Sequence, residues 1–255
     1  MCPDRKGSFD SSHPRYTSLK ERELLVDGFR AGLVVPEGLI AHGRGEMFDY
    51  LFGEETLPPA LFAEQAAAAA LKAAEKPVIS VNGNLAALCA KDIVLLAEET
   101  EACIEVNLFH WSEERAVAIR KLLESNGGKG VLAEAPDASL EGVQHDRGKC
   151  HTAGIFSADA VLIPLEDGDR ASALVEMGKT VISIDLNPLS RTTLFSSISI
   201  VDEVTRAMPN LVRFAKEFKG KEERAKQIVE YFDNAASLRE MYRLIGERFA
   251  KLASP

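Results

Sequence analysis

Six short and continuous apolar runs constrain the fold of this chain more than any other feature. An apolar residue at every position of a run, rather than at every second one, indicates a strand that is covered on both faces. Each run is separated from the next by a loop or a helix-like segment, which is typical of parallel strands joined by helices. We therefore expect an α/β protein with a Rossmann-like three-layer fold and a mostly parallel six-stranded sheet. The runs occupy residues 78–81, 103–106, 131–133, 160–163, 181–184 and 198–201.

Helical patterns precede and follow these runs. Ser18 and Glu21 match a capping box, in which each side chain satisfies a free amide at the start of a helix. Five consecutive alanines over 66–70 favour a helix, and apolar residues spaced among charges after Asp202 predict amphipathic helices. We expect helices over about 18–31, 43–52 and 57–76. The chain would then consist of a flexible tail over 1–12 and one Rossmann-like domain over 13–202 that includes the N-terminal helices. C-terminal helices over 203–255 would pack on this domain or on a partner subunit.

Composition excludes several classes of protein. The 255 residues carry 39 acidic and 30 basic side chains, a net charge of −9. A negative protein lacks the positive field that nucleic acids and anionic membranes require, so we expect neither as a partner. The four cysteines form no C-x-x-C pair, and no segment approaches the roughly 18 apolar residues of a membrane-spanning helix, so we expect a cytoplasmic protein without disulfides. His145 and His151 flank Cys150 without a second ligand cluster, and we expect no metal site there.

Polar residues follow several of the expected strands, where open parallel sheets bind their ligands. Asn82-Gly83-Asn84 joins the first strand to a helix start, whose free amides suit a phosphate or carboxylate, although a tight turn also requires such residues. Glu166-Asp167-Gly168-Asp169-Arg170 follows the fourth strand, with carboxylates suited to Mg²⁺ or, in the case of Asp169, to capping the next helix. Asp185-Leu186-Asn187 follows the fifth strand.

Two glycine-containing motifs have different interpretations. His42-Gly43-Arg44-Gly45-Glu46 places a guanidinium between two glycines, which would bring it and the backbone close to a planar anion; a solvated helix start is the alternative. Gly178-Lys179-Thr180 is similar to the end of a phosphate-binding P-loop. The loop would require glycine where Ala173 stands, and a strand follows instead of a helix, so we interpret this segment as a turn.

Five segments carry a resemblance to a known family. They are Ser12 to Tyr16, Gly38 to Glu46 with Phe48 to Tyr50, Val81 to Asn84, Pro164 to Arg170 and Ile184 to Arg191. In this order the segments resemble archaeal phosphopantothenate synthetase, also called 4-phosphopantoate:β-alanine ligase, from about residue 12 to residue 206. The weakest regions of the match are the N-terminal tail and the C-terminal helices.

This resemblance implies an ATP-dependent ligase of coenzyme A biosynthesis. The family condenses 4-phosphopantoate with β-alanine to give 4′-phosphopantothenate, AMP and pyrophosphate through an acyl-adenylate, as a Rossmann-like homodimer with Mg²⁺ accompanying the nucleotide. Two alternatives stay open: another nucleotide-dependent Rossmann-fold enzyme, such as an oxidoreductase or transferase, and a non-catalytic nucleotide sensor. The first alternative is disfavoured because the glycine fingerprint is missing after the first strand.

The resemblance and the motifs together assign the site residues. Arg44, His42 and Asn84 are expected to be catalytic. Expected ATP contacts are Arg22, Arg44, Asp185, Leu186, Asn187, Arg191, Thr192, Glu203 and Val204. Expected substrate contacts are Arg15, Asn82, Gly83, Asn84, Asp167 and Asp169. These arginines and the amides at the strand ends predict a positive pocket in an otherwise acidic protein.

Overall fold

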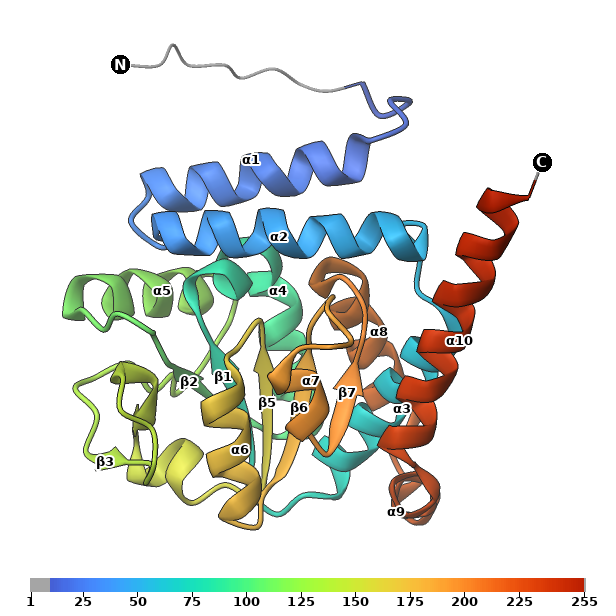
Figure 1. The fold of residues 1–255 in the computed structure, drawn as a ribbon. Helices are drawn as coiled ribbons and strands as arrows, with labels where there is room; N and C mark the ends of the chain where they lie inside the picture. The colour runs from blue at the N-terminus through green and yellow to red at the C-terminus, as the bar shows by residue number, and fades with distance from the viewer. Residues whose placement is uncertain (1–9, 255) are drawn as a thin grey trace.

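A central parallel sheet organises the molecule (Figure 1). The computed structural model describes residues 10–254. All neighbouring strands of the sheet run parallel, in the order β2-β1-β5-β6-β7. The α/β class and the mostly parallel sheet are therefore confirmed, with five strands instead of six. The strands are β1 (Pro77–Val81), β2 (Cys103–Val106), β5 (Ala160–Pro164), β6 (Thr180–Ile184) and β7 (Ile198–Ile200).

The third apolar run does not form the strand that was predicted. Residues 131–133 make a single parallel bridge, in which Leu132 lies beside Glu105 at the outer edge of β2. The run is three residues long and follows Gly130, whose φ of +60° turns the chain, so it is too short to extend into a ladder. The segment nevertheless lies outside β2, where a third strand would be. With the six segments numbered along the chain, the spatial order is 3-2-1-4-5-6, that of a Rossmann fold. A short antiparallel pair, β3 (Ala138–Ser139) and β4 (Lys149–Cys150), lies in the following segment.

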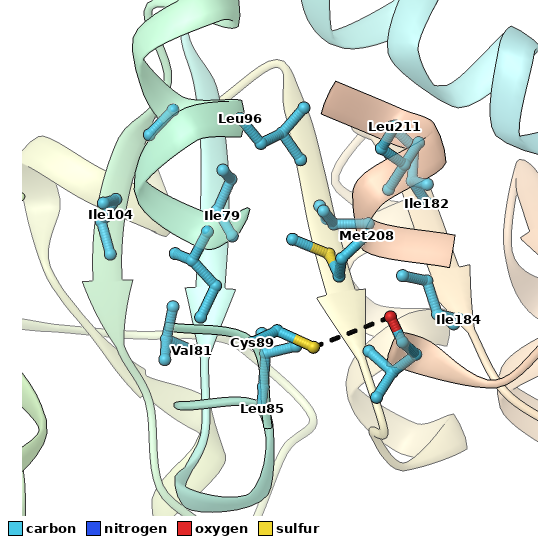
Figure 2. Packing of buried hydrophobic residues seen from close by; sticks show 14 of the residues in the cluster. Ile79, Val81, Leu85, Cys89, Leu96, Ile104, Ile182, Ile184, Met208 and Leu211 are labelled. Atoms are coloured by element: carbon cyan, nitrogen blue, oxygen red, sulfur yellow. Dashed lines mark hydrogen bonds between the residues drawn. The ribbon is translucent and has the colours of Figure 1, made fainter. Parts of the chain in front are cut away.

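Helices cover both faces of the sheet, which explains why its strands are apolar at every position. On one face, side chains such as Ile79 and Ile182 pack against α3 (Pro58–Ala73), α4 (Gly83–Thr100) and α8 (Val204–Glu217) (Figure 2). Figure 2 also shows the thiol of Cys89 facing the Val204 carbonyl oxygen at 3.7 Å, where α4 meets α8. On the other face, Val161 and its neighbours pack against α6 (Gly168–Glu176). Alternate residues of one strand thus enter two different cores.

The remaining helices complete the two outer layers. Ser112 caps α5 by accepting a hydrogen bond from the Arg115 amide at 3.3 Å. The chain is helical after the sheet, as predicted, and α10 packs against α2 and α3. No helix in the described part of the chain is both long and apolar enough to cross a membrane. These helices are α5 (Glu113–Ser125), α7 (Arg191–Phe195), α9 (Glu222–Tyr231) and α10 (Asn234–Ala253).

The two N-terminal helices begin earlier than predicted. They are α1 (Tyr16–Arg30) and α2 (Pro36–Phe52). The predicted capping box is wrong, because Arg15 occupies the N-cap position and the Ser18 hydroxyl donates to Glu46 on α2, at 2.6 Å. Pro36 starts α2, where a missing amide hydrogen costs no hydrogen bond. The segment 42–46 therefore lies in the middle of a helix, and not at its start.

Helix α2 crosses the carboxyl edge of the sheet (Figure 1). Near its start, the Gly38 carbonyl oxygen accepts a hydrogen bond from the side chain of Asn84, just after β1, at 2.9 Å. One residue past its middle, Gly45 lies against Leu186, which follows β6. Near its end, Asp49 pairs with Arg206, which follows β7. The helix thus covers the edge at which the sequence places the site.

Candidate functional site

The carboxyl end of β1 lies at the point where the strand order changes direction. The chain runs from β1 to β2 on one side and later continues with β5 on the other, which is where doubly wound sheets bind ligands. The Asn82 amide nitrogen donates to the Pro164 carbonyl oxygen at 2.9 Å, while its oxygen accepts from the Leu85 amide at 3.0 Å. Asn82 therefore ties β1 to β5 and caps α4. The tight turn is wrong, because none of these residues has a positive φ and α4 begins directly at Gly83, while binding of an anion there stays a prediction.

The loop after β6 is tightly ordered around one buried carboxylate. Asp185 accepts hydrogen bonds from the Asn187 amide at 2.9 Å and from the Ser190 hydroxyl at 2.5 Å. Burial raises the pKa of Asp185, and the two hydrogen bonds oppose this shift. Ser190 in turn caps α7 through the Thr193 amide at 3.1 Å. The segment expected to contact ATP is therefore held in one shape by its own side chains.

The segment after β5 packs directly against the start of α7. A Cβ atom on Gly168 would lie 2.3 Å from the Arg191 Cβ, so no larger residue fits between α6 and α7. The Thr192 hydroxyl donates to the Glu166 carbonyl oxygen at 2.9 Å. Asp169 pairs with the exposed Arg191 at 2.7 Å. The structure thus brings together two segments that are about 20 residues apart in the sequence and that were assigned to substrate and to ATP.

The expectation that Asp169 caps the following helix is wrong. Helix α6 begins at Gly168, so the residue in the N-cap position is Asp167, which accepts from the Arg170 amide at 3.0 Å. His145, Asp167 and Asp169 each offer a ligand atom within 4.8 Å of the others. Because one carboxylate caps a helix and the other pairs with Arg191, this group by itself defines no metal site.

Arg44 lies on α2 beside the loop that follows β6. Its side chain is exposed and makes no hydrogen bond or ion pair with the rest of residues 10–254. Gly45, the next residue, lacks a side chain where α2 meets Leu186: a Cβ atom there would be 3.4 Å from the Leu186 Cδ1. Burial lowers the pKa of His42, against the opposing charge of Glu46, so its imidazole is neutral at pH 7. The motif therefore presents one unpaired cation at the carboxyl edge of the sheet, called the rim below, from the middle of a helix.

Glu46 forms a hub that the sequence did not predict. Its carboxylate accepts hydrogen bonds from Arg15 at 2.8 Å, Arg22 at 2.5 Å, Ser18 at 2.6 Å and Tyr50 at 2.7 Å. Partial burial alone would raise the pKa of Glu46, but the hydrogen bonds and positive charges of its partners lower it. Two of the expected anion contacts are therefore oriented by a carboxylate on α2.

A buried network joins the N-terminal helices to the start of α8. Thr205 donates to Glu21 of α1 at 2.5 Å and hydrogen-bonds to the N-cap residue Glu203. Burial and the neighbouring Glu21 raise the pKa of Glu203 to about 7. Arg206 pairs with both Asp49 and Asp202. The segment 203–204 is thus buried beneath α1, where it supports the shape of the rim.

Two further predictions concern the histidines around Cys150 and the turn before β6. His151 lies beside the buried Glu105, with 3.4 Å between Nδ1 and Oε1, whereas His145 stacks on Phe109 at 4.7 Å between ring centroids. The two histidines are therefore not grouped around Cys150. Gly178 has a φ of +79° and the next residues enter β6, which confirms a turn in place of a P-loop.

Two arginines share one carboxylate at the other end of the rim, and the sequence did not predict this arrangement. Glu166 pairs with the fully buried Arg170 at 3.0 Å and also with Arg147. Arg170 donates to the Ser80 hydroxyl of β1 at 3.0 Å. Only Arg170 belongs to a motif visible in the sequence; Arg147 comes from the long segment after β2, which carries no recognisable pattern.

The fold and the rim define the class of the protein. A Rossmann-ordered sheet, helix N-termini at its carboxyl edge and arginines along α1 and α2 are typical of an α/β protein that binds small anions such as nucleotides. The family model described as phosphopantothenate/pantothenate synthetase matches residues 59–248. The chain belongs to this family.

Relatives of known name cover nearly the whole chain. A 4-phosphopantoate--beta-alanine ligase of Methanosarcina mazei is 53% identical over 244 residues, 95% of this chain and 96% of that protein. The protein of the same name from Thermococcus kodakarensis is 47% identical over 95% of this chain and 94% of its own. That of Methanospirillum hungatei is 55% identical over 81% and 84%. The resemblance proposed from the sequence motifs is thereby confirmed.

Proposed function

We propose that this protein is an ATP-dependent ligase that joins 4-phosphopantoate to β-alanine, giving 4′-phosphopantothenate, AMP and pyrophosphate in coenzyme A biosynthesis. The single observation that carries the proposal is the similarity, along 95% of the chain, to proteins named for this reaction. The carboxyl edge of the sheet supports it, because the residues that the family resemblance assigns to ATP lie along α1, α2 and the ends of β6 and β7. A cytoplasmic location stays a prediction.

The chemistry requires two anions to approach each other. The carboxylate oxygen of 4-phosphopantoate would attack the α-phosphorus of ATP, and the bond between this phosphorus and the bridging oxygen would break to release pyrophosphate. The β-alanine amine would then attack the acyl carbon, lose a proton and displace AMP. The protein's contribution is to hold the reactants in line and to stabilise the extra negative charge. Arg44 suits the second task, since no carboxylate of residues 10–254 pairs with it.

Mg²⁺ is expected to arrive with ATP. This ion is held mainly by phosphate oxygens and water, with one or two carboxylates, so it needs no protein cage. Asp169 is the candidate carboxylate because it is exposed, and the ion would replace Arg191 as its partner. When bound, the ion would neutralise charge on the leaving pyrophosphate.

We also propose that the protein is a homodimer that uses the outer face of α2. Ile40 and Met47, seven residues apart on one side of this helix, are 63% and 55% exposed, and Phe29 of α1 is 44% exposed. Apolar side chains grouped on one face are typical of subunit interfaces. Light scattering of the wild type and of an Ile40→Glu variant tests this: we expect a dimer that weakens in the variant, and a monomeric wild type would refute the dimer.

The activity is tested by product formation. Purified protein incubated with ATP, 4-phosphopantoate and β-alanine should release AMP and pyrophosphate in equal amounts with 4′-phosphopantothenate. Omission of β-alanine should stop AMP release and limit pyrophosphate release to about one equivalent per site, because the adenylate then stays bound. An oxidoreductase or a nucleotide sensor would release no AMP, so a folded protein that releases none refutes the ligase.

A further inference from the structure

We propose that Arg115, Arg147 and Arg170, together with the N-terminus of α4, bind the phosphate group of 4-phosphopantoate and make the enzyme prefer it to unphosphorylated pantoate. These three residues are called the arginine cluster. The inference rests on the proposed function and names the part of the rim that recognises one end of the substrate.

Arg115 lies at the start of α4 and forms no ion pair with the described residues. Its guanidinium donates to the carbonyl oxygens of His110 at 2.7 Å and Leu33 at 3.3 Å, which fix its position without neutralising it. A Cβ atom on Gly83 would lie 3.4 Å from Arg115 Nη2, so the group stands directly beside the first residue of α4. Among the described residues, the amides of Gly83 and Asn84 donate no hydrogen bond. A cation and two free amides therefore share one place.

The side-chain charges around this place balance one another. Arg147 and Arg170 share the carboxylate of Glu166, and Asp167 lies 3.8 Å from Arg147 Nε. Lys149 is paired with Asp146 at 2.8 Å and adds nothing. Three guanidinium groups thus face three carboxylates, because Glu37 acts on Arg115, and the partial positive charge of the α4 N-terminus is the part left without a counter-charge.

Several buried donors of the cluster have no hydrogen-bond partner, as have both carboxylate oxygens of the neighbouring Glu166. The side chain of Arg170 is completely buried, and its Nε and Nη2 atoms have no hydrogen-bond partner; Nε of Arg115 is also buried without one. Burial, and then the charge of Arg147, lower the pKa of Arg115, and the charge of Glu37 opposes this shift, so Arg147 and Glu37 both lie near Arg115. Buried donors without acceptors are costly, and an anion with several oxygens would satisfy them.

The length of the substrate matches the distance across the rim. Five bonds separate the carboxyl carbon of 4-phosphopantoate from its phosphorus, about 6 Å in an extended chain. Neighbouring strands lie about 4.8 Å apart. If the substrate carboxylate meets ATP near the end of β6, the phosphate of the same molecule lies one to two strands away, towards β5 and β1. The arginine cluster lies there.

The same geometry favours the cluster over Arg15 as the phosphate ligand. Arg15 is held by Glu46, whereas the β1 motif meets α2 at Gly38. Glu46 and Gly38 are eight residues apart on α2, which is about 12 Å along the helix. Arg15 and Asn84 therefore do not serve the same end of a short substrate.

The test compares two substrates in matched variants. In Arg115→Met we expect the KM for 4-phosphopantoate to rise about 30-fold or more, with little change in the KM for ATP. The much weaker activity on pantoate should be retained, so that the ratio of kcat/KM values for the two substrates collapses. Arg120→Met is the control, because Arg120 lies on the same helix but pairs with Glu124 and Glu134. An unchanged ratio in Arg115→Met would overturn the inference.

A binding measurement separates this inference from the proposed function. Inorganic phosphate at millimolar concentration should raise the melting temperature of the wild type but not that of Arg115→Met, while Arg115→Lys should keep part of the effect. If the wild type releases no AMP, the proposed function fails, and the phosphate measurement still decides the inference. If the wild type is active and phosphate stabilises both proteins equally, the inference alone fails.

Discussion

Replacing Glu46 with glutamine should destabilise the protein by about 1–2 kcal/mol at pH 7. The difference should exist only at pH values at which the carboxylate of the wild type is charged. The carboxylate holds Arg15 and Arg22, whose side chains are 39% and 46% exposed, so each ion pair is screened and contributes about 0.5 kcal/mol. The hydroxyls of Ser18 and Tyr50 can still donate to the amide oxygen, and their hydrogen bonds weaken by a similar amount in total. For a chain of 255 residues, this corresponds to a fall of roughly 2–6 °C in Tm.

The pH dependence gives the sharper test. The pKa of Glu46 is lowered in the folded protein, so its stabilisation is fully present above the unfolded value of about 4.3 and is lost as the pH falls through the folded value. The difference in Tm between wild type and Glu46→Gln should thus be constant from about pH 7 to 5 and shrink below about pH 4. Because Arg22 is an expected ATP contact, the KM for ATP should rise about three- to tenfold as its orientation is lost.

Scanning calorimetry from about pH 3.5 to 7, with Tyr50→Phe as the control, decides the question. The control removes only one hydrogen bond to this carboxylate and leaves both ion pairs, so at pH 7 it should cost about 0.5–1 kcal/mol, less than Glu46→Gln. A Glu46→Gln protein with the Tm of the wild type at pH 7, or one whose loss does not change below pH 4, would refute the reasoning.

Three further predictions follow from single side chains. Arg44→Ala should reduce kcat at least about 100-fold and leave Tm within about 1 °C, because the side chain is exposed and unpaired within residues 10–254; steady-state kinetics and calorimetry check both. Burial and the neighbouring Asp202 raise the pKa of Glu64 to about 9, so the stability of the wild type should fall relative to that of Glu64→Gln as the pH rises from about 5 to 9. Urea titrations across this range measure the free energy of unfolding of both proteins, and a constant difference between them would contradict the prediction. Gly83→Ala should cost about 2–3 kcal/mol in urea denaturation, because the new Cβ would lie 2.1 Å from the Leu33 carbonyl oxygen; an unchanged midpoint would show that this contact relaxes freely.

The apolar runs predicted the sheet well because burial on both faces leaves a local signal. The run at 131–133 failed for a reason that is also local: three residues after Gly130 allow one bridge and no ladder. The capping box failed for a different reason. Ser18 and Glu21 have the right identities and spacing, but their partners are Glu46 and Thr205, which lie on other helices. Tertiary contacts decided between two uses of the same side chains.

The site was predictable in its positions but not in its pairings. Residues after strand ends lie on the rim because parallel strands end at one edge, and this is a rule of topology. The segment 42–46 was expected at the start of a helix over 43–52, whereas it lies in the middle of α2, with Gly45 against Leu186. Arg115 contacts Leu33 and Arg147 pairs with Glu166. These partners are far away in the sequence, and no local pattern predicts such contacts.

Helix α2 also acts as a ruler for the edge that it crosses. Its contacts at Gly38, Gly45 and Asp49 are seven and four residues apart, about 10 Å and 6 Å at the rise of an α-helix. The strands beneath them, from β1 to β6 and from β6 to β7, are separated by two spacings and one spacing of about 4.8 Å. One inserted or deleted residue between these contacts would shift the helix by 1.5 Å and turn it by about 100°, so that the contacts on one side of the change could no longer form. The length of this segment is therefore fixed by the spacing of the sheet, whichever side chains it carries.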